Sequence, residues 1–237
     1  MSGHSKWAQI HRQKGTADAK RGALFTKLGK SITIAAKIGG SDPDMNFKLR
    51  LAIDQAKSAN MPKENIERAI KKGAGELDDG KKIESINYEG FGPDGIALII
   101  ETLTDNRNRS SSSLKHILSK YGGGLGGPNS VSWMFSQKGI IRIKDIDENL
   151  ELELIDAGAT DIKREDNGIS VYTQPSDLQK IKNLLEKKGT NIEYAEVEQI
   201  ANDPKEVSAD TQQKLEKVFE ELDNDEDVNN YYTNVKN

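Results

Sequence analysis

The residues whose type and spacing suggest chemistry are basic, and they lie toward the N-terminal end of the chain. The first 40 residues contain eight Lys and Arg residues and a single acid, Asp18. Four of the lysines follow one another at intervals of seven, three and seven residues, which on a helix places them within an arc of about 100°. Cations in such an array neutralise phosphates and release counterions, so the pattern favours contact with a nucleic-acid backbone. The four are Lys20, Lys27, Lys30 and Lys37.

The segment before these lysines adds further cations and one aromatic residue, Trp7. The Trp7 ring has the shape to stack on a base or to pack back against the helices, and the sequence leaves both interpretations open. Ordinary solvated helix faces are the alternative for the cations as a whole. We predict a nucleic-acid-binding set of Lys6, Trp7, Arg12, Lys14, Lys20, Arg21, Lys27, Lys30 and Lys37.

A second basic group lies near a glycine-rich stretch in the middle of the chain. Three of its glycines match G-x-G-x-x-G by letter, but they follow an expected helix and precede an expected strand, the reverse of the order in a dinucleotide site. We interpret the stretch as a flexible surface loop with a functional role. The predicted second contact surface consists of Arg107, Arg109, Lys115, Gly123 and Gly124.

No combination of residues in the sequence points to an enzyme or a metal site. The chain has no cysteine, and its three histidines lack a neighbouring cluster of carboxylates. There is no G-x-S-x-G nucleophile motif. A small enzyme assembled from distant carboxylates is the least favoured class. We therefore expect no catalytic residue, no metal and no cofactor.

Charge is divided unevenly along the 237 residues. Residues 1–82 carry a net charge of +8 and the remainder −12, which together make the overall −4. This division indicates a basic domain for a polyanion, attached to acidic domains with another role. No apolar run reaches the roughly 18 residues that a membrane span requires, and the N-terminal residues lack a signal-peptide core. We expect a cytoplasmic protein that does not contact a membrane.

Apolar spacing predicts three helices in the basic part of the chain. One covers residues 16–38, and a second follows a cap at Ser41-Asp42-Pro43, with Met45 opening its apolar stripe. The third begins at Pro62 and ends at Gly73. A linker rich in glycine and aspartate then leads to alternating strands and helices. The expected strands are 84–89, 95–103, 130–135, 139–144, 161–165, 169–174, 191–200 and 228–234, and the expected helices are 110–121, 148–157, 176–188 and 209–222.

The order of these elements predicts the domain organisation. Residues 139–200 form a complete strand-helix-strand-strand-helix-strand series, the ferredoxin-like order. Residues 83–136 lack one helix and one strand, which 206–237 would supply by folding back. We predict an α+β fold with a helical basic domain at 1–80, a discontinuous α/β domain at 83–136 plus 206–237, and an inserted ferredoxin-like domain at 139–200. Both α/β domains are expected to be ferredoxin-like.

Several longer motifs resemble the YebC/PmpR family along essentially the whole chain. Ser110 stands where that family usually has threonine, and the glycine stretch is richer than its usual pattern. The motifs are Gly3-His4-Ser5-Lys6-Trp7, residues 61–73, residues 88–93, residues 104–109, residues 130–135, Asp156-Ala157-Gly158-Ala159 and residues 227–234.

The resemblance implies three domains and a transcriptional regulator that binds DNA. The family also includes the mitochondrial translational activator of cytochrome c oxidase, and bacterial members are linked to the ribosome and to the synthesis of proline-rich stretches. Two hypotheses follow: a DNA-binding transcriptional regulator, or a ribosome-associated translation factor that binds ribosomal RNA and aids synthesis of proline-rich sequences. No helix with base-reading Arg, Asn and Gln stands out, so lysine contacts to the backbone are expected. The expected partners are DNA or ribosomal RNA and the ribosome, bound by a monomer.

Overall fold

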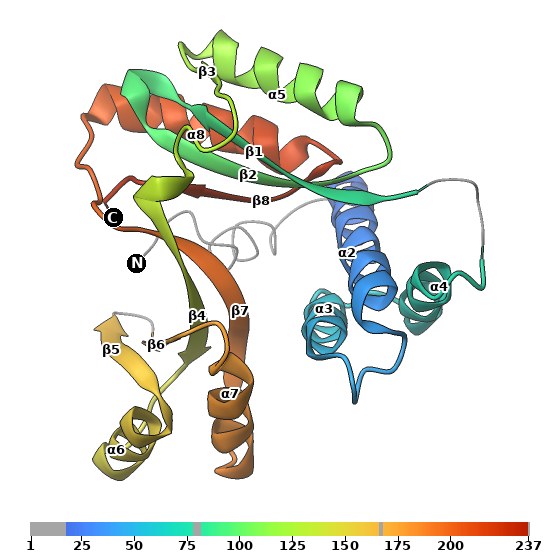
Figure 1. Ribbon diagram of the computed structural model, residues 1–237, viewed down its shortest axis with the longest axis vertical. Coiled ribbons are helices and arrows are strands. Elements are labelled where there is room, and N and C mark those ends of the chain that lie inside the picture. Colours follow the sequence, from blue (N-terminus) through green and yellow to red (C-terminus); the bar gives the residue numbers. More distant parts are fainter. Residues whose placement is uncertain (1–17, 78–81, 166–167, 237) are drawn as a thin grey trace. The chain divides into compact units, whose positions relative to one another are not determined.

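The computed structural model describes residues 18–77, 82–165 and 168–236, and the side chains of that range from Gly22 onward (Figure 1). Residues 135–202 form one compact unit, and the remaining described residues form another. The fold class is α+β, as predicted: a three-helix N-terminal domain is followed by two α/β domains, the second inserted into the first. No described helix combines the length and the apolar character needed to cross a membrane.

The N-terminal domain is a bundle of three helices, α2 (Asp18–Gly39), α3 (Phe47–Ser58) and α4 (Lys63–Gly73). Apolar residues at helical spacing turn toward one another and form its core, as the periodicity predicts. Removing these aliphatic side chains from water stabilises the bundle by about 25 cal/mol per Å² of buried apolar surface. Its fully buried side chains include Ile32, Leu49 and Ala56.

The start of α3 differs from the prediction. Asn46, and not the Ser41-Asp42-Pro43 segment, caps the helix: its side-chain oxygen accepts a hydrogen bond from the Leu49 N–H. The amide of the same side chain donates to the backbone oxygen of Ala35 in α2, so the cap also ties the two helices together. Met45 precedes the helix and is 84% exposed, so it does not open the apolar stripe.

The discontinuous α/β domain contains an antiparallel sheet with strand order β3-β1-β2-β8. Pairing of β2 with β8 brings the C-terminal segment back to this sheet. Helices α5 and α8 cover one face of it (Figure 1), where Leu98, Leu114 and Phe219 are buried in one core cluster. The elements are β1 (Glu84–Phe91), β2 (Ala97–Thr104), α5 (Arg107–Lys120), β3 (Gly124–Leu125), α8 (Ala209–Asn224) and β8 (Val228–Thr233).

One strand prediction for this domain was wrong. Residues 130–135 do not form a strand of the sheet; they contain a short 3-10 helix, η2 (Ser132–Met134), and the first residue of the next strand. The edge strand is instead β3, from the glycine stretch, which pairs with Gly90 and Phe91 of β1. A two-residue strand carries no alternation of polar and apolar side chains, so the period-2 signal for strands cannot detect it.

The inserted domain has the strand order β5-β6-β4-β7, which is that of the ferredoxin-like fold. Asp147 caps the start of helix α6, because its side chain accepts a hydrogen bond from the Leu150 N–H. Gly158 caps the other end with a φ of 112°, a conformation that glycine adopts readily. The elements are β4 (Phe135–Ile143), α6 (Glu148–Ala157), β5 (Ala159–Glu165), β6 (Gly168–Thr173), α7 (Leu178–Lys187) and β7 (Ile192–Ala201). The two expected strands at 130–135 and 139–144 thus contribute to the single strand β4.

Candidate nucleic-acid interface

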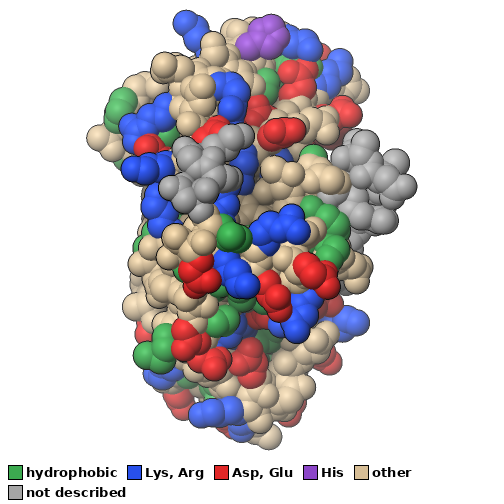
Figure 2. Space-filling view, turned by 90° about the vertical axis from the view of Figure 1, so that its right-hand side faces the viewer, with side chains coloured by type: hydrophobic (Ala, Val, Ile, Leu, Met, Phe, Trp, Pro, Cys, Tyr) green, Lys and Arg blue, Asp and Glu red, His purple; other side chains and the backbone are tan. Residues whose placement is uncertain are grey.

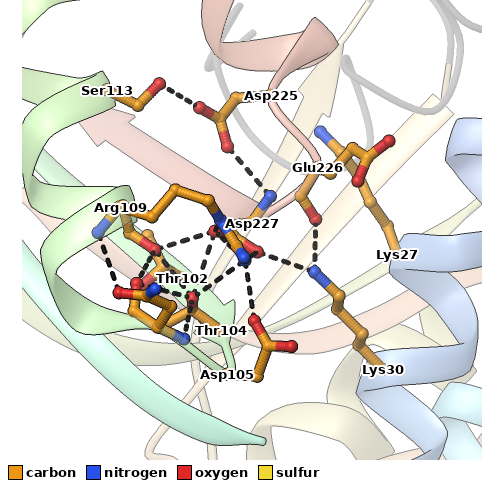
Figure 3. A network of polar contacts seen from close by, with 12 residues as sticks. Lys27, Lys30, Thr102, Thr104, Asp105, Arg109, Ser113, Asp225, Glu226 and Asp227 are labelled. Carbon is orange, nitrogen blue, oxygen red and sulfur yellow. Dashed lines mark hydrogen bonds and ion pairs between the residues drawn. The ribbon is translucent and has the colours of Figure 1, made fainter.

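Helix α2 is attached to the turn between α8 and β8 by a buried ion pair (Figure 3). The Lys30 Nζ lies 2.8 Å from Asp227 Oδ1 and donates a second hydrogen bond, 2.9 Å long, to the backbone oxygen of Glu226. The side chain of Lys30 is 17% exposed and that of Asp227 only 5%. This pair therefore connects the helical domain to the discontinuous α/β domain in a largely dry environment.

Asp227 is the centre of a wider network, which we call the Asp227 junction (Figure 3). Its carboxylate also accepts hydrogen bonds from Arg109 at 2.7 Å, from Ser110 Oγ at 2.8 Å and from Thr104 Oγ1 at 3.1 Å. Burial by itself would raise the pKa of Asp227, but the hydrogen bonds from Lys30, Arg109 and Ser110 outweigh it and lower the pKa from 3.8 to about 2. The carboxylate is consequently held in its charged form.

Lys27 lies one turn before Lys30 and also faces the chain's own C-terminal segment. Its Nζ donates to the backbone oxygens of Asp223, at 2.7 Å, and Leu222, at 3.4 Å, near the C-terminal end of α8. A cation is favourable there because the unpaired carbonyls of a helix end carry partial negative charge. Burial is the largest influence on the pKa of Lys27 and, although Asp223 and Asp225 oppose it, lowers that pKa from 10.5 to about 8.

Lys27 and Lys30, two of the four lysines in the predicted arc, are therefore turned toward the chain's own C-terminal segment. The amino groups of Lys27 and Lys30 are taken up by acceptors of the α8–β8 region, because a cation removed from water must be paired with an acceptor. Lys37 remains exposed, but its Nζ contacts the Ile83 backbone oxygen at 3.3 Å. Lys6, Trp7, Arg12 and Lys14 lie outside the described residues, as do the side chains of Lys20 and Arg21, and their roles stay predictions.

The predicted second contact surface is divided between the two ends of α5. Arg107 and Arg109 lie in the first turn, whereas the glycine stretch follows the last of 14 residues, so about 20 Å separates them. Arg107 Nη2 is 2.5 Å from Glu84 Oε2, and Arg109 is paired with Asp105 and Asp227. Lys115 is exposed in the middle of the helix. The structure therefore does not bring these residues together.

The glycine stretch is packed against β1, and this packing explains two of its five glycines. A Cβ at Gly123 would collide with the Phe91 backbone oxygen, and one at Gly126 with Ser130 Oγ. Glu89 Oε2 accepts hydrogen bonds from the N–H groups of Val131, at 2.7 Å, and Ser132, at 2.8 Å, and so holds the following turn. At Gly123 and Gly126 the interpretation as a flexible loop is thus replaced by close backbone approach, for which a side chain leaves no room. Gly122, Gly124 and Gly127 differ, since nothing lies within 4 Å of a Cβ added to any of them, although Gly122 has a φ of +83°, which favours glycine.

A cleft of about 610 Å³ lies beside the Asp227 junction. Phe25 and Thr26 of α2 and Asn65, Arg68 and Lys72 of α4 line one side. Asp105, Arg109 and Glu226 line the other. The α4 residues were missed as site residues, although their i, i+3, i+7 spacing indicates a common helix face and was available in the sequence.

On the surface, cations and acids are mixed. Figure 2 shows Lys and Arg side chains interspersed with Asp and Glu over much of the face turned to the viewer. Among the described residues there is no group of three or more His, Cys, Asp or Glu side chains placed to hold a metal ion.

Comparison with known proteins assigns the chain to a family. A family model described as the TACO1/YebC protein N-terminal domain matches residues 5–76, and one described as the TACO1/YebC second and third domain matches residues 83–235. A protein of Thermoanaerobacter pseudethanolicus named "Probable transcriptional regulatory protein" is 48% identical over 240 residues, covering 100% of this chain and 97% of the relative. One of the same name from Chlorobium chlorochromatii is 49% identical, with 100% and 96% covered.

A solved structure agrees with these matches. The crystal structure of a conserved hypothetical protein from Aquifex aeolicus superimposes with a TM-score of 0.83 at 42% sequence identity, covering 92% of this chain and 91% of that one. Sequence motifs, family models and fold all lead to the same assignment. The chain belongs to the TACO1/YebC family.

Proposed function

We propose that this chain is a non-enzymatic, cytoplasmic regulator of gene expression that acts as a monomer by binding nucleic acid, with DNA as its target. The observation that carries the proposal is the excess of cations at the N-terminal end, where eight Lys and Arg residues accompany one acid within 40 residues. Relatives that match over their full length bear the name of transcriptional regulatory proteins, which supports the same conclusion.

The contacts described above restrict which cations take part. Lys30 pairs with Asp227, and Lys27 donates to backbone oxygens at the C-terminal end of α8, so both amino groups are already used within the chain. The predicted cations that remain for a ligand are Lys6, Arg12, Lys14, Lys20, Arg21 and the exposed Lys37, with Trp7 as the aromatic residue among them. Lysine and arginine contacts to phosphates position a protein on nucleic acid with little dependence on base sequence. We therefore propose weakly specific, salt-sensitive binding.

The alternative is a ribosome-associated translation factor that binds ribosomal RNA, and one observation favours it. A helix that reads duplex DNA must enter a major groove about 12 Å wide. The α4 face with Asn65 and Arg68, which are base-reading residue types, instead lines a cleft opposite Asp105 and Glu226 of the same chain. That placement suits RNA or another partner with accessible single strands more than an intact duplex.

The test compares two sets of charge reversals at matched salt. Lys6→Glu, Arg12→Glu and Lys14→Glu combined should abolish the gel shift of promoter DNA and co-sedimentation with ribosomes. The control variant carries Lys144→Glu, Lys180→Glu and Lys187→Glu. These three residues are exposed in the inserted domain, and their substitution changes the net charge by the same amount. Equal loss of binding in both triple variants would overturn the proposal. Ribosome binding that survives excess duplex DNA would establish the translation alternative, and sedimentation of the free protein tests the monomer.

A further inference from the structure

The cleft beside the Asp227 junction has two sides with different electrostatic states. On the sheet side, the guanidinium of Arg109 is paired with Asp105 and Asp227, at 2.9 Å and 2.7 Å. Lys30, also on the lining, is paired with Asp227. Glu226 adds an exposed carboxylate to the same side, so this side offers a polar wall without unused positive charge.

The α4 side is different. Within residues 18–77, 82–165 and 168–236, the side chains of Arg68 and Asn65 form no hydrogen bond or ion pair. Their positions differ by three, so they lie on the same face of α4, about one turn apart. The cleft thus presents an uncompensated cation and a side-chain amide with free donors and an acceptor, next to the aromatic ring of Phe25.

We propose that this cleft binds a short stretch of single-stranded nucleic acid, with a phosphate at Arg68 and a base edge at Asn65. The inference rests on the proposed function and names its ligand more narrowly. A cationic contact to the backbone beside an aromatic surface is the combination by which proteins hold single strands. The Asn65 amide matches the paired donor and acceptor of an adenine edge, and an unpaired base exposes such an edge.

The opposite wall is what selects a single strand. A duplex is rigid and presents its bases only through its grooves, so a reading helix has to project from the protein. Asn65 and Arg68 do not project in this way, because Arg109, Asp105 and Glu226 lie across the cleft from them. A single strand bends freely and can turn a nucleotide into a cleft of about 610 Å³.

The experiment measures fluorescence anisotropy of the full chain with labelled single strands of about ten nucleotides, deoxyadenosine or adenosine, and with a duplex of equal length. Arg68→Glu should weaken single-strand binding about tenfold. It should also reduce the slope of log affinity against log salt concentration by about one, which corresponds to the loss of one phosphate contact. Lys71→Glu is the matched control: it changes the charge equally, on the same helix, at an exposed residue that does not line the cleft. It should change the affinity less than about twofold.

Asn65→Ala adds a test that does not involve charge. It should weaken binding to adenine-containing strands about threefold without altering the salt slope, because only the amide contact is lost. Binding to thymidine strands should not change. Comparing the affinities for deoxyadenosine and adenosine strands shows whether the cleft prefers single-stranded DNA or RNA. Thermal melts of each variant show whether the fold is retained.

The outcomes separate this inference from the proposed function. A selective effect of Arg68→Glu and Asn65→Ala on single strands supports the cleft. Equal effects of Arg68→Glu and Lys71→Glu, or duplex binding that depends on Arg68 as strongly, overturn the cleft and leave the N-terminal cations as the binding site. If the wild-type chain binds none of the three nucleic acids, both the cleft and the proposed function are overturned.

Discussion

Helices α2 and α4 both carry cations at helical spacing, but the surroundings of those cations differ. On α2, Lys27 and Lys30 donate to acceptors in the α8–β8 region. On α4, Arg68 has no such partner among the described residues and lines an open cleft. Periodicity along a helix therefore identifies a face, whereas the groups across from that face decide whether its charges are available to a ligand.

The reason lies in the cost of removing a charge from water. The ammonium group of a lysine that is covered by other elements needs a partner, and the C-terminal carbonyls of α8 and the carboxylate of Asp227 supply it. At an exposed position the solvent itself satisfies the cation, and the charge can be exchanged for contact with a phosphate. The same residue type thus holds domains together in one place and can meet a ligand in another.

The largest expected effect comes from removing the acceptor at the junction. Asp227→Ala should lower the free energy of unfolding by about 3 kcal/mol, because it leaves Lys30 and Arg109 without the buried carboxylate that pairs with both. Urea denaturation measures the change. Asp105→Ala is the control, since Asp105 also pairs with Arg109 but in a more exposed position, and it should cost about 1 kcal/mol or less. Similar losses in the two variants would contradict the contrast between buried and exposed charges.

An intermediate effect is expected from two neighbouring glycines. Gly123→Ala should lower the free energy of unfolding by about 2 kcal/mol, because the new Cβ would overlap the Phe91 backbone oxygen. Gly124→Ala should stay within about 0.5 kcal/mol of the wild type, because nothing lies within 4 Å of its new Cβ. Thermal melts of the two variants provide the comparison. If both are tolerated, the glycine stretch is not held by close packing and a flexible functional loop becomes the better interpretation.

The smallest effect is expected for Lys27→Met. At neutral pH the free energy of unfolding should change by about 1 kcal/mol or less, since the desolvation that lowers the pKa of Lys27 offsets much of what its hydrogen bonds contribute. Nucleic-acid affinity should remain that of the wild type, because the ammonium of Lys27 is bound to α8. A marked loss of affinity in a folded variant would return Lys27 to the binding set.

The same variant has a defined pH signature. The pKa of Lys27 is lowered to about 8 in the folded chain from the ordinary 10.5, so between these values the unfolded chain binds more protons at this position. The free energy of unfolding of the wild type, relative to Lys27→Met, should therefore rise as the pH increases from about 8 to 10.5. Urea denaturation across that range measures the difference. A constant difference would show that Lys27 is not buried.

Much of the fold could be predicted where the signal is local. Helix α6 has an Asp cap at one end and a Gly at the other, and its predicted range of 148–157 matches the structure. Helix α4 ends at Gly73, as expected. Prediction failed where a distant contact overrides the local pattern. Asn46 caps α3 while bonding to α2, and the edge strand β3 exists because β1 offers it hydrogen bonds.

The candidate site could be predicted only in part, for the same reason. The sequence shows that cations are concentrated before residue 40, and it shows which residues share a helix face. It contains no local sign that Asp227 pairs with Lys30, a residue 197 positions away, or that Asn65 and Arg68 lie opposite the first turn of α5. Such pairings become visible only when the C-terminal segment has returned to the sheet.

By itself, the sequence determined the helices and most of the strands, the division into a basic and an acidic part, and the family. These follow from short-range backbone geometry, composition and motif content. Only the tertiary structure decided that Lys27 and Lys30 hold domains together while Arg68 lines an open cleft. That decision depends on which acceptors surround each ammonium or guanidinium group, and long-range packing brings those acceptors into place.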